Sequence, residues 1–457
     1  MRFSFGYLLL FGVALASEET YRAGFGATTL GDLESYVPLI HEAGKLNVDI
    51  LVLPSPQVSS LSPLERSCEI DNYDEVVKTM AAASKQARLY VVAHLLEKTR
   101  CQNKDELVRS NLVFDREGNI VAVYRKPLNN IDNCTTSATN IGSFTTDFGV
   151  QFGLLMEEDL VLHKVQDLEL KNYVMAGAWS SEIAFLSASQ FALSWAFTHD
   201  VNLVSSSGIF SGRRGSIASS ETGVTVADLN KLGEYQQASA PLVNLSTLKD
   251  TPIEDLSQYI IRPLDLTASV HGYKETVCHG GLCCEFYVKT GFVGSKDDEV
   301  TYGLAAFDGV RHFDRTHNIG AQTCAVFACA GLCKRTYNLG SQNDTNVVFE
   351  EISISGNFTE SIQYPIILTG SQSEPGKFDM YVQTKQVTLQ NMDFENLLTF
   401  GLFGRDFSKD TEDFVLDTDS VSIYETINEE MTEFFDYVWI RLRVLLIFAS
   451  IYVLEMM

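Results

Sequence analysis

The stretch LVLPSPQV, residues 51–58, sets the expectation for the fold of this chain. Its first residues belong to the apolar run Ile50–Leu53, which stops at Pro54. An apolar run that ends at a proline is typical of a buried strand at the point where it leaves its sheet. In α/β folds the carboxyl ends of such strands carry the chemistry. The residue after the proline, Ser55, is therefore a candidate site residue.

The sequence around this stretch alternates between helix and strand patterns over the first 210 residues. Apolar side chains recur at helical spacing in 31–46, 73–88 and 187–198. We expect strands over 49–53, 89–93, 111–114, 120–124, 150–156, 173–176 and 201–204. The segment Asp115–Asn119 (DREGN) predicts a hairpin turn between two of them. The pattern predicts an α/β layered fold with parallel and antiparallel neighbours.

The character of the sequence changes after about residue 265, where helical periodicity fades. Short apolar runs separated by turn residues predict a β-rich second domain, namely Thr301–Phe307, Val347–Ile354, Lys377–Val382 and Leu397–Phe403. The acidic stretch Asp406–Glu430 predicts a solvated linker. A length of 457 residues suffices for two domains. A net charge of −25 without a basic run argues against a nucleic-acid partner.

The N-terminus has the pattern of a cleaved secretory signal. Arg2 precedes the apolar segment Tyr7–Val13, and Ala14-Leu15-Ala16 offers small residues for a cut before Ser17. The apolar segment is too short for a membrane-spanning helix. Residues 1–16 are therefore predicted to be a signal peptide, and the mature chain is expected to be extracellular or at the cell surface.

The C-terminus ends in a second apolar segment, Val444–Leu454, which is too short to span a membrane. A terminal apolar tail behind a polar spacer is the pattern of a removable GPI lipid-anchor signal. The alternative is a helix that packs on the body of the protein or lies on a membrane surface. Under the first interpretation the cell membrane is a partner through the anchor.

Cysteines and sequons agree with a secreted chain. The nine cysteines are Cys68, Cys101, Cys134, Cys278, Cys283, Cys284, Cys324, Cys329 and Cys333. Six of the nine fall between 278 and 333, which predicts disulfides in an oxidising compartment, with a zinc site as the alternative. An odd number leaves one thiol over, and Cys134 is the candidate. The chain has four glycosylation sequons, at Asn133, Asn244, Asn343 and Asn357, and we expect two or three of them to be used.

Several segments resemble one known family. They are Cys278–Cys284 (CHGGLCC), Asp298–Gly309 (DEVTYGLAAFDG), Leu402–Asp406 (LFGRD), Gly177–Trp179 (GAW) and the helix through Trp195. Over residues 20–425 the chain resembles the vanin and biotinidase branch of the nitrilase, or carbon–nitrogen hydrolase, superfamily, and is similar to insect-type vanin-like proteins. The resemblance implies an αββα-sandwich nitrilase-like domain over 17–265. A smaller β-rich, disulfide-containing base domain follows over 266–425, and then the tail 426–457. Outside the cysteine-rich cluster, Cys68 and Cys101 are expected to form a structural disulfide.

The resemblance also implies a chemistry, the hydrolysis of linear amides of the pantetheine or biotinyl type. That reaction uses a glutamate as base, a lysine for the oxyanion and a cysteine as nucleophile. It implies a small-molecule amide as ligand, no cofactor and no metal. Lys126, in Tyr124–Pro127 (YRKP), matches the lysine. Ser55 stands at the glutamate position, and Glu157, in Gly153–Asp159 (GLLMEED), stands at the cysteine position.

These two replacements predict a catalytically impaired or inactive member of the family, a pseudoenzyme. A carboxylate is a weaker nucleophile toward an amide than a thiolate, and a serine hydroxyl is not basic near neutral pH. The alternative is an active amidohydrolase with displaced residues, such as a Ser55–Lys126 pair. We also expect Lys126 and Glu157 to form a buried ion pair where the triad stood. The sequence names no ligand and no protein partner.

Overall fold

The computed structural model describes most of the chain between residues 19 and 410. The described residues are 19–27, 35–54, 64–66, 75–101, 104–127, 142–162, 170–177, 188–212, 215–218, 222–233, 256–292, 300–313, 318–330, 347–369, 378–381, 386–394 and 397–410.

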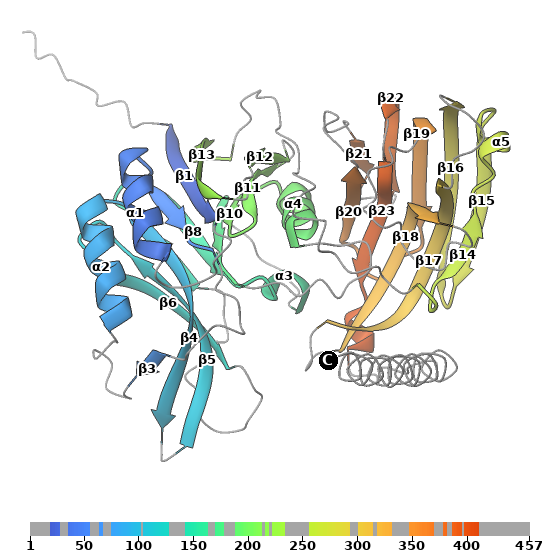
Figure 1. Cartoon of the computed structure of the whole chain (residues 1–457). Coiled ribbons are helices and arrows are strands. Elements are labelled where there is room, and N and C mark those ends of the chain that lie inside the picture. Colours follow the sequence, from blue (N-terminus) through green and yellow to red (C-terminus); the bar gives the residue numbers. More distant parts are fainter. Residues whose placement is uncertain are drawn as a thin grey trace, which may run out of the picture.

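The first half of the chain contains two sheets, each with parallel strands at its centre (Figure 1). The first sheet has the order β13 (Gly223–Asn230), β1 (Thr20–Ala27), β2 (Ile50–Val52), β4 (Tyr90–Cys101), β5 (Lys104–Phe114) and β6 (Ile120–Pro127), with β3 (Leu64–Arg66) beside β4. The second has the order β12 (Ser216–Ala218), β11 (Gly208–Ser211), β10 (Asn202–Ser205), β9 (Asn172–Met175), β8 (Gln151–Leu155) and β7 (Gly142–Thr145).

Helices cover the outer faces of these two sheets (Figure 1). Helices α1 (Tyr36–Lys45) and α2 (Glu75–Ala87) pack on the first sheet, where Ile40 and Met80 are buried against its strands. The second sheet carries α3 (Asp159–Leu162) and α4 (Ala188–His199) on its other face. The layers are therefore helix, sheet, sheet, helix, which is the αββα sandwich that the resemblance implied.

The space between the two sheets is mainly apolar, with polar links such as the 2.9 Å hydrogen bond from Tyr21 Oη of β1 to Asn172 Oδ1 of β9. Phe25 and Val92 of the first sheet meet Phe152 and Val174 of the second in a buried cluster. Asn111 of β5 crosses this layer and donates from Nδ2 to the carbonyls of Leu155 at 2.7 Å and Ala176 at 2.9 Å. Its Oδ1 meets His94 Nδ1 at 2.7 Å. Burial lowers the pKa of His94 to about 4, so this histidine is a neutral core residue.

The predicted hairpin turn is confirmed between β5 and β6. Asp115 Oδ1 accepts hydrogen bonds from the backbone N–H groups of Glu117 at 2.9 Å and Asn119 at 2.7 Å. Gly118 has φ +82°, and a Cβ there would lie 2.4 Å from the carbonyl oxygen of Ala81 in α2. Only glycine fits this left-handed position so close to a helix.

The second half of the chain is a pair of stacked sheets, as its short apolar runs predicted. One has the order β14 (Ile260–Pro263), β17 (Val300–His312), β18 (Asn318–Ala330), β23 (Leu397–Arg405) and β20 (Gln363–Thr369). The other has the order β15 (Tyr273–His279), β16 (Leu282–Phe292), β19 (Val347–Gly356), β22 (Gln386–Phe394) and β21 (Phe378–Tyr381). Their facing apolar side chains, among them Val326 and Ile354, form one buried cluster. A single helical turn, α5 (Leu266–Ser269), begins at Asp265, whose carboxylate caps it.

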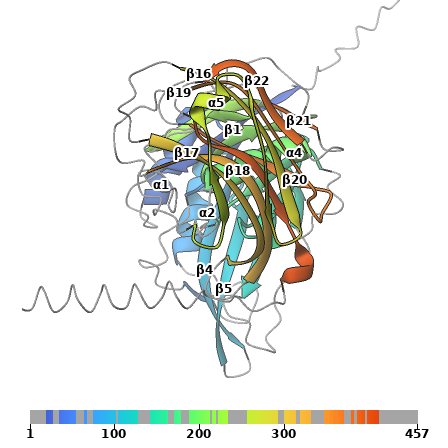
Figure 2. The same ribbon diagram turned by 90° about the vertical axis from the view of Figure 1, so that its right-hand side faces the viewer.

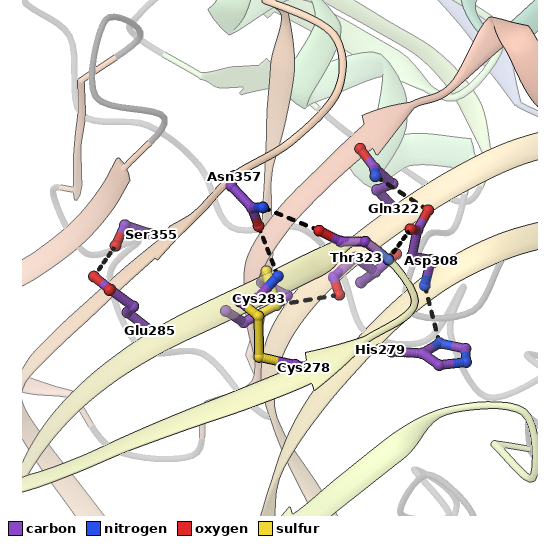
Figure 3. The surroundings of a disulfide bond; sticks show 12 residues. Cys278, His279, Cys283, Glu285, Asp308, Gln322, Thr323, Ser355 and Asn357 are labelled. Atoms are coloured by element: carbon purple, nitrogen blue, oxygen red, sulfur yellow. Dashed lines mark hydrogen bonds between the residues drawn. A yellow bond between two sulfur atoms is a disulfide. The ribbon is translucent and has the colours of Figure 1, made fainter.

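Disulfides hold this second unit, which confirms the interpretation of its cysteine cluster. Cys278 and Cys283 join the two strands of the β15–β16 hairpin, and Cys284 and Cys324 join the two sheets. Figure 3 shows how the first disulfide is surrounded by polar contacts. Asn357 accepts from the Cys283 N–H at 2.6 Å and donates to the Gly281 carbonyl at 3.0 Å.

Asp308 holds the same hairpin from the neighbouring sheet (Figure 3). Its Oδ2 accepts from the Gly281 N–H at 2.8 Å, and its Oδ1 accepts from Gln322 Nε2 at 3.1 Å. These hydrogen bonds and the disulfide fix the turn of the β15–β16 hairpin, which lies within the segment Cys278–Cys284 that carries the sequence resemblance. Among the residues that the structure describes, no group of three or more histidine, cysteine or acidic side chains could hold a metal ion.

The two halves share a core, so the molecule is a stack of layers (Figures 1 and 2). Phe191 and Trp195 of α4 pack in one buried cluster with Tyr364 of β20 and Phe403 of β23. In Figure 2, where the second half faces the viewer, its curved strands lie in front of α4 and the first unit. Helix α4 is thus the layer between the second sheet of the first unit and the first sheet of the second.

The prediction of a solvated linker from Asp406 is wrong over its first five residues. Asp406 is only 3% exposed and begins a short 3-10 helix, η6 (Phe407–Lys409). Lys409 Nζ reaches Asp308 Oδ1 at 2.5 Å, which ties this segment to β17. Acidic composition alone misses such a segment because Asp406 and Asp410 pair with Lys409 and Arg405, and Lys409 in turn pairs with Asp308, 101 positions away. No helix in the described part of the chain is long and apolar enough to cross a membrane.

Candidate functional site

The lysine that the sequence singled out lies at the end of β6. Tyr124 and Lys126 are two residues apart, so both point to the same face of the strand. Below them lies Asp159, the first residue of α3, which is fully buried. Lys126 Nζ forms a hydrogen-bonded ion pair with Asp159 Oδ1 and lies 3.8 Å from Glu158 Oε1. This lysine is therefore already engaged by carboxylates.

Asp159 is fixed from three sides. Tyr124 Oη donates to its Oδ1 at 2.9 Å, and the Met156 N–H donates to its Oδ2 at 2.7 Å. With Lys126 on the same carboxylate, both oxygens are used. A buried carboxylate is stable only when it is paired and hydrogen-bonded in this way.

Glu157 precedes α3 and is also buried, with 3% of its surface exposed. Its Oε1 accepts a hydrogen bond from Ser206 Oγ at 3.1 Å. In the part of the chain that the structure describes, its Oε2 has no hydrogen-bond partner. Burial, with a smaller contribution from the charge of Glu158, raises the pKa of Glu157 to about 8, against the lowering effect of Ser206. Glu157 is therefore mainly a neutral carboxylic acid at pH 7.

The predicted ion pair between Lys126 and Glu157 is wrong, since Lys126 pairs with Asp159 and Glu158 instead. The physical reason is the geometry of the turn. Tyr124 and Lys126 share one strand face, and the first residue of α3 lies against that face, whereas Glu157 lies against Gly177 and Ser206. A Cβ on Gly177 would come within 3.2 Å of the Glu157 backbone nitrogen, so this contact is close.

A second set of ion pairs surrounds the turn. Arg109 Nη1 and Nη2 each lie 3.0 Å from an oxygen of Glu158. Arg125, on the opposite face of β6 from Lys126, donates from Nε to Glu97 at 2.9 Å. Ser110 Oγ donates to the same Glu97 oxygen at 2.9 Å. The basic and acidic partners are Lys126, Arg109 and Arg125 with Asp159, Glu158 and Glu97. Among the described residues these three cations match these three carboxylates, and a neutral Glu157 adds no charge to them.

The glycine of the matched motif has a local packing role. Gly153 lies in β8, and a Cβ at this position would come within 2.3 Å of the ring of Tyr173 on β9. Because glycine has no side chain, the ring of Tyr173 can lie over Gly153 while β8 and β9 pair. Because β8 leads directly into the turn, this packing fixes where Glu157 and Asp159 lie.

The remaining predicted site residues fall largely outside the described part of the chain. These are Ser55, Asn133, Asn244, Asn343, Cys68 and Cys134, and Cys101 ends β4 without a described side chain. Asn357 is described and exposed, at the end of β19. The predictions made for the undescribed residues, including the Ser55–Lys126 pair, stay predictions.

Sequence reasoning missed two contributors to the site. Ser206 follows β10 in the run Ser205–Ser207, and polar residues directly after a predicted strand were a usable signal. Arg109 gave no local signal, because it meets Glu158 across 49 positions of sequence.

The layered fold and the lysine-bearing strand beside the 153–159 turn define an α/β sandwich of the carbon–nitrogen hydrolase type with a β-rich C-terminal unit. The model of the vanin C-terminal domain matches residues 251–410. Vanin-like protein 1 of Drosophila melanogaster is 25% identical, covering 86% of each chain. Dog pantetheinase is 26% identical over 74% of this chain and 71% of its own length. Cattle biotinidase is 22% identical over 78% of each chain.

Together these matches support a member of the vanin and biotinidase branch of the nitrilase superfamily, an amide hydrolase family. Among solved structures it is similar to Nit3 of Saccharomyces cerevisiae, with a TM-score of 0.36 and 16% identity over 46% of this chain and 90% of that one.

Proposed function

We propose that this chain is a vanin-family protein that has lost amide hydrolysis by the thioester route and acts as a non-catalytic, ligand-binding member. The observation that carries the proposal is the neutral, buried Glu157 at the position of the nucleophile. A protonated carboxyl group is a poor nucleophile toward an amide carbon. Even when ionised, a carboxylate is a much weaker nucleophile toward amides than a thiolate.

The state of Lys126 supports the same conclusion. In an acyl-transfer site a lysine at this position must face the developing oxyanion. Here its ammonium group is engaged by Asp159 and lies near Glu158. An ammonium group that is held by carboxylates in this way is poorly placed to act as the base of the serine–lysine alternative.

The test is pantetheine hydrolysis, because the mammalian relatives are named for it. We expect no cysteamine release from the native protein and measurable turnover from the double variant Ser55→Glu and Glu157→Cys. Each single variant serves as a control and should stay inactive, because base and nucleophile are both needed. Turnover by the native protein at a rate comparable to the double variant would refute the proposal.

A second candidate rests on the hydrogen bond from Ser206 to Glu157. A serine hydroxyl beside a carboxyl group is a nucleophile beside a base once that carboxyl group is ionised. The chain would then be an active hydrolase with displaced residues. Its activity on an ester or amide would rise with pH through about 8, the pKa of Glu157, and would vanish in Ser206→Ala. If no hydrolysis is detected at any pH between 6 and 10, this candidate is ruled out.

We further propose that the chain enters the secretory pathway and reaches the extracellular space or cell surface, where a lipid anchor holds it. The signal-type N-terminus, the apolar tail and the disulfides of the second unit support this. Expression in animal cells tests it, with N-terminal sequencing for a start at Ser17 and phospholipase release for a GPI anchor. Glycosidase treatment, read at the Asn357 peptide, tests modification at the sequon that the structure describes.

A further inference from the structure

Arg405, the last residue of β23, connects the C-terminal unit to the candidate site. Its side chain is 3% exposed. Its Nε donates to the carbonyl oxygen of Val161 in α3 at 2.7 Å. Val161 lies only two residues after Asp159, the carboxylate that holds Lys126. A residue that lies far from the site in sequence therefore touches the turn that forms it.

The C-terminal unit holds the guanidinium group of Arg405 firmly. Nη2 donates to both oxygens of Asp410, at 2.9 and 2.7 Å, and Nη1 donates to the carbonyl of Gly320. The ring of Phe407 lies 4.4 Å from the guanidinium carbon. A planar group with several fixed donors can serve these partners and Val161 at once. Lysine could not, because its ammonium is a single point charge on a flexible stem.

The turn that Arg405 contacts is too short to be stable alone. Helix α3 has four residues, and isolated helices of that length do not form in water. Its internal bonds are few, such as Val161 N–H to the Glu158 carbonyl at 3.1 Å and Leu162 N–H to the same carbonyl at 2.8 Å. The carbonyls at its C-terminal end need outside donors, and a cation is favoured there. Arg405 supplies both a donor and a charge.

We propose that Arg405 is a positioning residue that fixes the 157–162 turn from the C-terminal unit, so that the geometry of the site depends on that unit. The proposal concerns how the turn is held and does not depend on whether the site is catalytic. Without Arg405 the turn relaxes, Glu157 gains access to water, and Asp159 loses its fixed place under Tyr124 and Lys126. The short helix, the apolar packing of Leu160 and the contact with Arg405 therefore stabilise one another.

The test follows the titration of the Glu157 carboxyl group, which needs no enzyme activity. The C=O band of a protonated carboxylic acid is recorded by difference infrared spectroscopy between pH 4 and 10 and is assigned by its loss in Glu157→Gln. In Arg405→Met we expect the midpoint to fall by one pH unit or more from about 8 toward the ordinary value of 4.5. Arg405→Lys should give an intermediate midpoint.

Arg311→Met is the matched control in the same unit. Arg311 lies over the rings of Tyr259 and Phe307 and donates to Gln258 Oε1 at 3.2 Å, and within the described part of the chain it makes no hydrogen bond or ion pair with the 157–162 turn. Its substitution removes a partly buried arginine but should leave the midpoint unchanged. If Arg405→Met does not fold, Asp410→Asn replaces it as the test. This variant keeps Arg405 but weakens its ion pair with Asp410, so the midpoint should fall by a smaller amount. A folded Arg405→Met or Asp410→Asn protein with the native midpoint overturns the proposal.

Discussion

At the scale of single residues, the neutral state of Glu157 should make stability depend on pH. The folded state keeps this proton up to about pH 8, whereas the ordinary pKa is 4.5. Between these values the folded state binds one proton more than the unfolded chain, so the free energy of unfolding falls as pH rises. The contribution is lost at about 1.4 kcal/mol per pH unit across the window.

The variant Glu157→Gln isolates this contribution, because glutamine has nearly the same shape and no proton to lose. Between pH 5 and 7.5 the native protein should lose roughly 3 kcal/mol relative to Glu157→Gln. Urea unfolding of both proteins at several pH values measures the difference. Parallel stability profiles would mean that Glu157 is ionised in the folded state.

Lys126 is the second residue whose environment makes a strong prediction. Lys126→Met removes the ammonium group that pairs with the fully buried carboxylate of Asp159. Removing one partner of a buried ion pair typically costs about 3–5 kcal/mol. Adding Asp159→Asn should restore most of the loss, because asparagine carries no charge, its amide oxygen can accept from the Met156 N–H and its NH2 group can donate to the Tyr124 hydroxyl.

The matched control is Lys78→Met, which breaks an exposed pair with Glu75 on α2. Exposed pairs contribute about 0–1 kcal/mol, so this variant should unfold close to the native midpoint. Equal losses in Lys126→Met and Lys78→Met would show that the site pair is solvated rather than buried.

At the scale of elements, the two described disulfides should differ in their contribution to stability. Cys278 and Cys283 are 5 residues apart in one hairpin, whereas Cys284 and Cys324 are 40 residues apart and join two sheets. Closing a longer loop removes more entropy from the unfolded chain. The expected contributions are about 2 kcal/mol for the hairpin bond and about 4 kcal/mol for the inter-sheet bond.

Paired alanine variants test this order by urea unfolding. We expect Cys284→Ala with Cys324→Ala to lose more stability than Cys278→Ala with Cys283→Ala. Asn357 and Asp308 hold the hairpin turn by hydrogen bonds, which further limits the loss at the hairpin. If the hairpin variant lost more stability, the hairpin disulfide would contribute more than the bond between the sheets, contrary to this prediction.

The elements also show how far the sequence could predict this fold. Local periodicity and turn chemistry predicted α2, α4 and the 115–119 hairpin within two residues. The strand β1 was missed because it is defined by pairing with β13, some 200 positions away. At the site, the motif singled out Glu157, which the structure places in the turn before α3. Its neutral state and the Lys126–Asp159 pair depend on contacts between strands and a turn, which no single stretch of sequence contains.

At the scale of the whole molecule, α4 closes the open edge of a sheet in the other unit. Three polar residues of α4, each four positions apart, donate to carbonyls of β20 that are two positions apart. The pairs, helix residue first, are Gln190 with Ile367, Ser194 with Pro365 and Thr198 with Gln363. Four residues of helix rise about 6 Å and two residues of strand about 6.6 Å, so the two repeats match. Unpaired sheet edges tend to associate with other chains, and a covering helix prevents this.

The matching repeats lead to a prediction about cooperativity between the units. The triple variant Gln190→Leu, Ser194→Ala and Thr198→Val removes the polar stripe, that is, the three polar residues of α4 that donate to β20. It keeps the apolar packing around Trp195 but takes these donors away from the three β20 carbonyls. Each lost bond should cost about 1 kcal/mol. In the native protein, Trp fluorescence and far-ultraviolet circular dichroism should report one unfolding transition, because the shared core couples both units.

In the triple variant the two signals should separate, with fluorescence changing first. Trp195 lies in the α4 layer, whereas much of the β signal comes from the disulfide-held sheets, which can outlast it. Thr79→Val on α2 is the control, since the described hydrogen bond of its hydroxyl stays within its own helix, to the Glu75 carbonyl. If both signals still coincide in the triple variant at an unchanged midpoint, apolar contacts alone couple the units and the polar stripe only covers the sheet edge.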